Sequence, residues 1–232
     1  ALEILEAEGD TEYTEYYNLL GNLKEEFSLK TVEEWKQNLY WRWLYALLPL
    51  LEENKNTNLP CFTQSPAWVD KEVQTVLGSW TELRHDTILY AKQSYTMYTM
   101  AGKGMPPESK LTCGYVEPYP EVYARLEEMM RDLRNNLIAF DLAIEGIPEK
   151  IEEFEELLNK LKIISEKEIN NTTLSNEEYE FIWNVGSKLV FLKEFPSEIL
   201  EKITSDTDEK MEIVADVHTD VNTGQVLEEG VG

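Results

Sequence analysis

A helical spacing of apolar residues recurs along this chain and predicts its fold class. In residues 149–168 the apolar side chains lie three or four positions apart, with Glu and Lys between them. This spacing puts them on one face of an α-helix, which must pack against another surface. The face comprises Ile151, Phe154, Leu157, Leu158, Leu161 and Ile164.

Two capping boxes mark the starts of further helices. Thr31 is followed three residues later by Glu34, and Ser175 is followed in the same way by Glu178. In a capping box each side chain hydrogen-bonds the backbone N–H of the other residue. The first box predicts a helix through about residue 51, and the second predicts a helix that ends near residue 195. In the first helix a core stripe at four-residue steps comprises Trp35, Leu39, Trp43 and Leu47.

Prolines mark two more helix starts. Ser65 before Pro66 fits an N-cap with proline at the first helical position, and predicts a long helix towards residues 98–100. Residues 118–120 contain two prolines and lead into a helix predicted through about residue 144.

The character of the chain changes after residue 210. Residues 211–217 are short and apolar with acidic residues, and residues 222–224 resemble a turn before residues 225–228. This pattern predicts a β-hairpin. We therefore expect a mainly α-helical, bundle-like domain over residues 1–210. We expect a short C-terminal β-hairpin over residues 211–232, which begins a sheet continued in a larger protein.

The composition excludes several classes of partner and structure. Of the 232 residues 42% are hydrophobic and 11% aromatic, which is too apolar for a disordered chain. The net charge of −24 repels phosphate backbones, so we expect no nucleic-acid partner. No apolar run reaches the roughly 18 residues of a membrane span. Basic proteins, cations and neutral glycans remain compatible with the charge.

The two cysteines, Cys61 and Cys113, both lie in predicted loops. In an oxidising compartment they would form a disulfide, and the alternative is two buried free thiols. The high content of Glu, Lys and Ile is typical of thermophilic proteins.

The helix predicted from Pro66 carries a row of polar side chains. Glu82 and Asp86 lie one turn apart on one side, and His85 lies on a neighbouring row. An acid beside a histidine suits general acid–base work, and paired carboxylates suit cation binding. The candidate catalytic residues are Glu82, His85, Asp86 and Glu117. The alternative is a buried network in which Arg84, Asp86 and Glu117 neutralise one another and fix neighbouring helices.

Oxygen-bearing side chains occupy alternate positions near the C-terminus, as they do in calcium loops. The candidate ligands for Ca²⁺ or another divalent cation are Asp216, His218, Asp220, Asn222 and Glu228. Histidine is a poor calcium ligand, and Gly224 falls late for an EF-hand. The alternative is therefore a polar strand face followed by an Asx-type turn.

Three sequence blocks resemble a family of large exported bacterial and archaeal proteins known as domain of unknown function 3160. The blocks are WTELRHDTILYAKQ at residues 80–93, GYVEPYPEVYARL at residues 114–126 and DVHTD at residues 216–220. The resemblance runs from about residue 59 to residue 232. It implies that members are exported and extend beyond this chain at both ends, and it implies no particular activity.

No zincin, nucleophile-elbow, P-loop or dinucleotide-binding fingerprint occurs in the chain. We therefore expect a non-catalytic, extracytoplasmic or secreted structural or interaction domain. Its expected partners are the remaining segments of the parent protein, another protein or a glycan. Two alternatives stay open: a hydrolase or metal-dependent site on the long helix from Pro66, and a calcium-binding module in the C-terminal segment.

Overall fold

The computed structural model describes residues 2–9, 11–52, 59–87, 114–194, 215–220 and 225–229. For residues 84–87 and for both strands it describes the backbone alone. The described part is mainly helical, as the apolar spacing predicted. The helices are α1 (Leu2–Glu8), α2 (Tyr16–Ser28), α3 (Val32–Trp35), α4 (Leu39–Leu47), α5 (Pro66–Thr87), α6 (Pro120–Ala139), α7 (Ile147–Ile169) and α8 (Asn176–Lys193).

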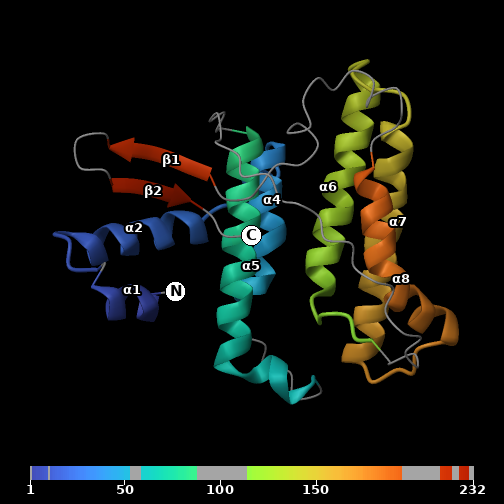
Figure 1. Cartoon of the computed structure of the whole chain (residues 1–232), viewed down its shortest axis with the longest axis horizontal. Coiled ribbons are helices and arrows are strands. Elements are labelled where there is room, and N and C mark those ends of the chain that lie inside the picture. The colour runs from blue at the N-terminus through green and yellow to red at the C-terminus, as the bar shows by residue number, and fades with distance from the viewer. Residues whose placement is uncertain are drawn as a thin grey trace, which may run out of the picture.

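The five helices α4 to α8 form two groups, which make contact through α6 (Figure 1). α4 and α5 run side by side in one group, and α6, α7 and α8 form the other. Two 3₁₀ turns, η1 (Leu48–Leu51) and η2 (Cys61–Gln64), follow α4 and precede α5. Within the described residues, every helix is too short or too polar to cross a lipid bilayer.

Two apolar clusters hold these groups together, and residues 114–126 contribute to both. The first joins α4, η1, α5 and α6, and its buried residues are Leu47, Leu50, Tyr119 and Val122. The second joins the segment before α6 to α7 and the approach to α8, and its buried residues are Val116, Ile164 and Leu174. The GYVEPYPEVYARL block therefore lies at the centre of the helical body.

Both predicted capping boxes are confirmed. The Glu34 N–H donates to Thr31 Oγ1, and the Thr31 N–H donates to the Glu34 carboxylate. Ser175 and Glu178 make the same reciprocal pair at the start of α8. The predicted proline start of α5 is also confirmed, because α5 begins at Pro66 and the Trp68 N–H donates to Ser65 Oγ.

The continuous helix predicted from residue 31 to residue 51 is wrong. α3 ends at Trp35, and α4 starts four residues later, at Leu39. Its N-cap is Asn38, whose Oδ1 accepts from the Trp41 N–H at 2.9 Å. The asparagine side chain thus replaces a helical backbone bond. Because the helix restarts, Leu39 is exposed although its spacing placed it in the core.

α6 ends at Ala139, earlier than the predicted residue 144, in a Schellman motif. Asp141 takes a left-handed φ of 57°, and the Leu142 N–H donates to the Leu137 carbonyl at 2.8 Å. Asp is one of the few residues other than Gly that adopts this conformation readily. The seven-residue loop 140–146 then leads into α7.

The C-terminal strands β1 (Ala215–Asp220) and β2 (Gln225–Glu229) pair antiparallel, with an irregularity between Asp216 and His218. The predicted turn at residues 222–224 lies outside the described residues, so the complete hairpin stays a prediction. Cys61 is exposed, so the alternative of two buried free thiols is wrong. Cys113 lies outside the described residues, and the disulfide stays a prediction.

Replacing Gly114 by alanine is expected to lower the free energy of unfolding by about 1 kcal/mol. A Cβ atom on Gly114 would overlap Cγ2 of Ile182 on α8, which would have to shift. Urea denaturation measures the effect. Gly186→Ala on α8 is the control, because no atom lies near its added Cβ, and it should be neutral or stabilising. Equal effects of the two substitutions would contradict this packing.

Candidate functional site

The segment before α6 is fixed by two hydrogen bonds to side chains of α7 and one to a side chain of α6. The Val116 N–H donates to the Glu168 carboxylate at 3.1 Å. The buried Ser165 hydroxyl donates to the Glu117 carbonyl at 3.0 Å, and the Tyr123 hydroxyl donates to the same carbonyl at 3.4 Å. These bonds fix the Glu117 backbone, so its side chain is held towards α5.

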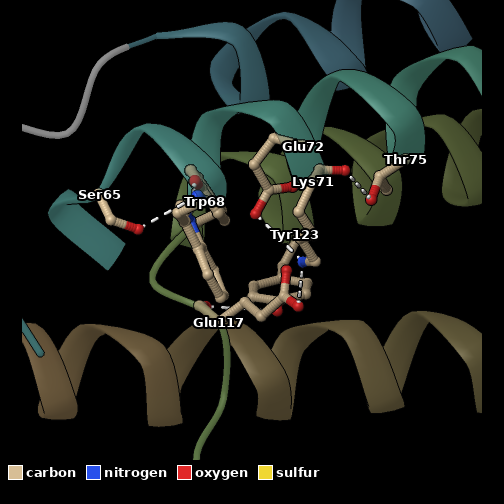
Figure 2. Close-up of polar contacts among 8 residues, drawn as sticks. Ser65, Trp68, Lys71, Glu72, Thr75, Glu117 and Tyr123 are labelled. Carbon is tan, nitrogen blue, oxygen red and sulfur yellow. Dashed lines mark hydrogen bonds and ion pairs between the residues drawn. The ribbon is translucent and has the colours of Figure 1, made fainter. Parts of the chain in front are cut away.

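On the α5 side, Lys71 is the centre of a charged cluster. Figure 2 shows its ammonium group between two carboxyl groups. Lys71 Nζ lies 2.5 Å from Glu117 Oε1 and 3.2 Å from Glu72 Oε1. It also lies 4.4 Å from the centroid of the Trp68 ring, within cation–π range. Trp68 Nε1 in turn donates to the Tyr119 hydroxyl at 2.8 Å. We call these five residues, with Glu168, the junction cluster.

Glu72 is the most enclosed acid of the junction cluster. Its side chain is 1% exposed, and its Oε2 atom has no hydrogen-bond partner among the described residues. Burial raises the pKa of the Glu72 carboxyl, and this effect outweighs the opposing hydrogen bond from Lys71. The pKa of Lys71 is raised as well, because hydrogen bonds with Glu117 and Glu72 outweigh the lowering by burial.

Glu168 and the tyrosines of the junction hold their protons to higher pH than exposed side chains of the same kind. Burial raises the pKa of Glu168 to about 7, although the Val116 N–H bond opposes the shift. Burial also raises the pKa of Tyr115 and of Tyr119 to about 12. The pKa of Tyr123 is raised too, by burial and then by the charge of Glu117. The phenols of this junction therefore stay neutral hydrogen-bonding groups.

The comparison with protein families matches the whole length of the chain. A family model described as "Protein of unknown function (DUF3160)" matches residues 1–232. The chain belongs to this family. The match includes the first 58 residues, which the three sequence blocks did not reach. No curated protein and no solved structure matches the chain.

One family block, residues 114–126, supplies four residues of these contacts, which are Val116, Glu117, Tyr119 and Tyr123. Of the predicted catalytic residues, Glu117 lies in this block and the other three lie on α5. Glu117 belongs to the junction cluster and pairs with Lys71. Glu82 is exposed on α5, ten residues after Glu72, or roughly 15 Å further along the helix. The side chains of His85 and Asp86 lie outside the described residues, as does that of Arg84. Glu117 is therefore the one candidate that the structure places in a cluster.

The candidates taken from the sequence did not include the other five residues of the junction cluster, which are Trp68, Lys71, Glu72, Tyr119 and Glu168. A signal for the two acids was present, because each lies on the apolar stripe of its own helix. Glu72 comes four residues after Trp68 and four before Val76, and Glu168 comes four residues after the buried Ile164. An acid in such a stripe faces the packed side of the helix and loses water.

Four of the five candidate ligands of the predicted metal site lie on the C-terminal strands. Asp216, His218, Asp220 and Glu228 lie on the two strands, where only the backbone is described, and Asn222 lies outside the described residues. In the strand register Asp216 is opposite Glu228. Where side chains are described, no group of three or more His, Cys, Asp or Glu residues is arranged to hold a metal ion. The calcium site stays a prediction.

Proposed function

We propose that this chain is a non-catalytic structural or interaction domain of an extracytoplasmic protein. The observation that carries the proposal is that charged side chains between the helices are paired with one another. Lys71 holds Glu117 across α5 and the segment before α6. Arg134 on α6 holds Glu155 on α7 through two hydrogen bonds, of 2.7 and 3.0 Å. Groups used in this way fix helix positions.

Further pairs join α6 to α4 and its approach, and α7 to α8. They are Lys36 with Glu128 at 2.6 Å, Arg42 with Asp132 at 2.5 Å, and Lys167 with Glu178 at 2.5 Å. The Arg125 guanidinium lies over the Tyr45 ring and donates to the Tyr45 carbonyl at 2.6 Å. α6 is thus paired with α4 and its approach on one side and with α7 on the other, as expected for a helix with a structural role.

The junction cluster also leaves a substrate little access to Glu72, its most buried acid. Glu72 is closed off from solvent, and the groove of about 520 Å³ between α7 and α8 is lined by other residues. A general acid or base must come within hydrogen-bond reach of the reacting group. The geometry therefore favours packing over catalysis for Glu72.

The extracytoplasmic location rests on the resemblance of the three sequence blocks, which implies export. The same resemblance implies a longer parent protein, and we propose that β1 and β2 begin a sheet completed by its other segments. The many exposed large apolar side chains on α2, α8 and the loop between α6 and α7 support a role in binding such segments or another protein.

We expect the purified chain to show no turnover of polysaccharide or peptide substrates, with or without added Ca²⁺ or Zn²⁺. The assay is release of reducing ends or of new amino termini over time. Turnover that is abolished by Asp86→Ala or Glu117→Gln, and retained by the exposed control Glu121→Gln, would overturn the proposal in favour of a hydrolytic site.

A further inference from the structure

The end of α6 and the loop between α6 and α7 present four large apolar side chains to solvent. The exposed fractions are 54% for Ile138, 72% for Phe140, 65% for Leu142 and 54% for Ile144. Single exposed apolar residues are ordinary, but such a concentration within seven residues marks an interaction surface. We call these four residues the tip surface.

The tip surface is held in one backbone conformation. The Phe140 N–H donates to the Asn136 carbonyl at 3.0 Å, and the Ile147 N–H donates to the Ile144 carbonyl at 3.0 Å. Between them lies the Schellman motif with Asp141 at φ 57°. A surface that is already ordered loses little conformational entropy on binding. The loop is thus built to present its apolar side chains.

The surroundings of the tip surface are acidic. Asp141, Glu145 and Glu149 are exposed on the loop and the first turn of α7, and none makes an ion pair with a described residue. The first basic residue after the loop, Lys150, is turned to α8. Its Nζ donates to the Phe191 carbonyl at 3.1 Å and lies 4.7 Å from the centroid of the Phe191 ring.

We propose that the tip surface binds a protein partner whose apolar pocket is edged by Lys and Arg. This proposal rests on the proposed function and assigns the interaction to one surface. Apolar contact supplies the affinity, and the acidic rim selects a basic partner and speeds its approach. The same rim repels an anionic lipid surface and the identical rim of a second copy.

The test uses the whole chain and a labelled amphipathic helical peptide of Leu and Lys, with binding followed by fluorescence anisotropy. The tip variant is Phe140→Ser with Leu142→Ser. The control variant is Leu29→Ser with Leu77→Ser, which removes two exposed leucines on α5 and at the end of α2. Urea denaturation checks that both variants are folded, since exposed substitutions have little effect on stability.

The tip variant is expected to bind the peptide about tenfold or more weakly than the wild type, and the control variant within about twofold. Replacing Lys by Glu in the peptide should abolish binding, and added NaCl should weaken it. Equal binding by the tip variant would overturn the proposal, because attraction to the acidic chain as a whole would then explain the affinity.

Two other occupants of the tip surface would give different results. Binding of the wild type, but not the tip variant, to neutral phosphatidylcholine vesicles would overturn the proposal in favour of a lipid surface. A concentration-dependent dimer that the tip substitutions dissociate would overturn it in favour of a second copy. The peptide-binding test does not depend on the turnover assay. A negative result for the tip surface would therefore leave the proposed non-catalytic function standing.

Discussion

Replacing Arg134 by alanine is expected to lower the free energy of unfolding by clearly more than replacing the neighbouring Arg131. Its Nε and Nη2 atoms donate to the two carboxylate oxygens of Glu155, which is 7% exposed. Without the guanidinium, Glu155 keeps a buried charge whose nearest described cation is Arg131 Nε, at 3.8 Å. The effect is smaller than for a fully buried pair, because solvent reaches part of Arg134.

Urea denaturation at neutral pH measures this effect, and Arg131→Ala provides the matched control. Arg131 lies one turn away on α6, is more exposed and pairs mainly with Glu127 on its own helix. Its removal should cost less than about 1 kcal/mol. The double substitution of Arg134 and Glu155 by leucine should recover most of the stability, since no unpaired charge remains. An Arg134→Ala effect no larger than that of Arg131→Ala would show that the pair does not hold the helices.

The helix starts were predictable because their determinants are local. In both capping boxes the bonded groups lie within four residues, so the sequence contains the whole interaction. The break after Trp35 also has a local cause in Asn38, a favoured N-cap residue. The continuous apolar spacing from Trp35 to Leu47 masked it. Where a periodic pattern and a capping residue compete, this chain follows the capping residue.

The junction cluster was only partly predictable, because its contacts join residues far apart in the sequence. Glu117 was identified, but its partner is Lys71, 46 positions earlier. The apolar stripes indicate that Glu72 and Glu168 are buried, but in a chain with 45 acidic residues they do not indicate which group each acid contacts. The backbone N–H that holds Glu168 comes from Val116, and no pattern along α7 indicates it.

Replacing Glu168 by glutamine is expected to raise the free energy of unfolding by about 2 kcal/mol above pH 7 and to leave it unchanged near pH 4. The folded pKa of about 7 lies above the ordinary value of 4.5, so the folded protein binds this proton more tightly than the unfolded chain. The resulting stability is fully present below about pH 4.5. It is lost as the pH rises to about 7, where the buried carboxyl ionises.

Glutamine keeps an oxygen that accepts the Val116 N–H and removes the charge that burial penalises. The full shift would correspond to about 3 kcal/mol, and we reduce this because part of the side chain is in contact with water. Urea denaturation at several values between pH 4 and pH 8 gives the stability of both proteins. A difference that is the same at both ends of this range would contradict the raised pKa.

The control for Glu168→Gln is Glu166→Gln, an exposed position two residues earlier on α7. The chain carries a net charge of −24, so removing any carboxylate relieves some repulsion as the pH rises. Glu166→Gln measures that general effect on the same helix. If the gain in free energy of unfolding depends more on pH for Glu168→Gln than for Glu166→Gln, the difference is caused by the burial of Glu168 between α7 and the segment before α6. Because Glu72 has a raised pKa for the same reason, Glu168→Gln should leave part of the junction's pH dependence in place.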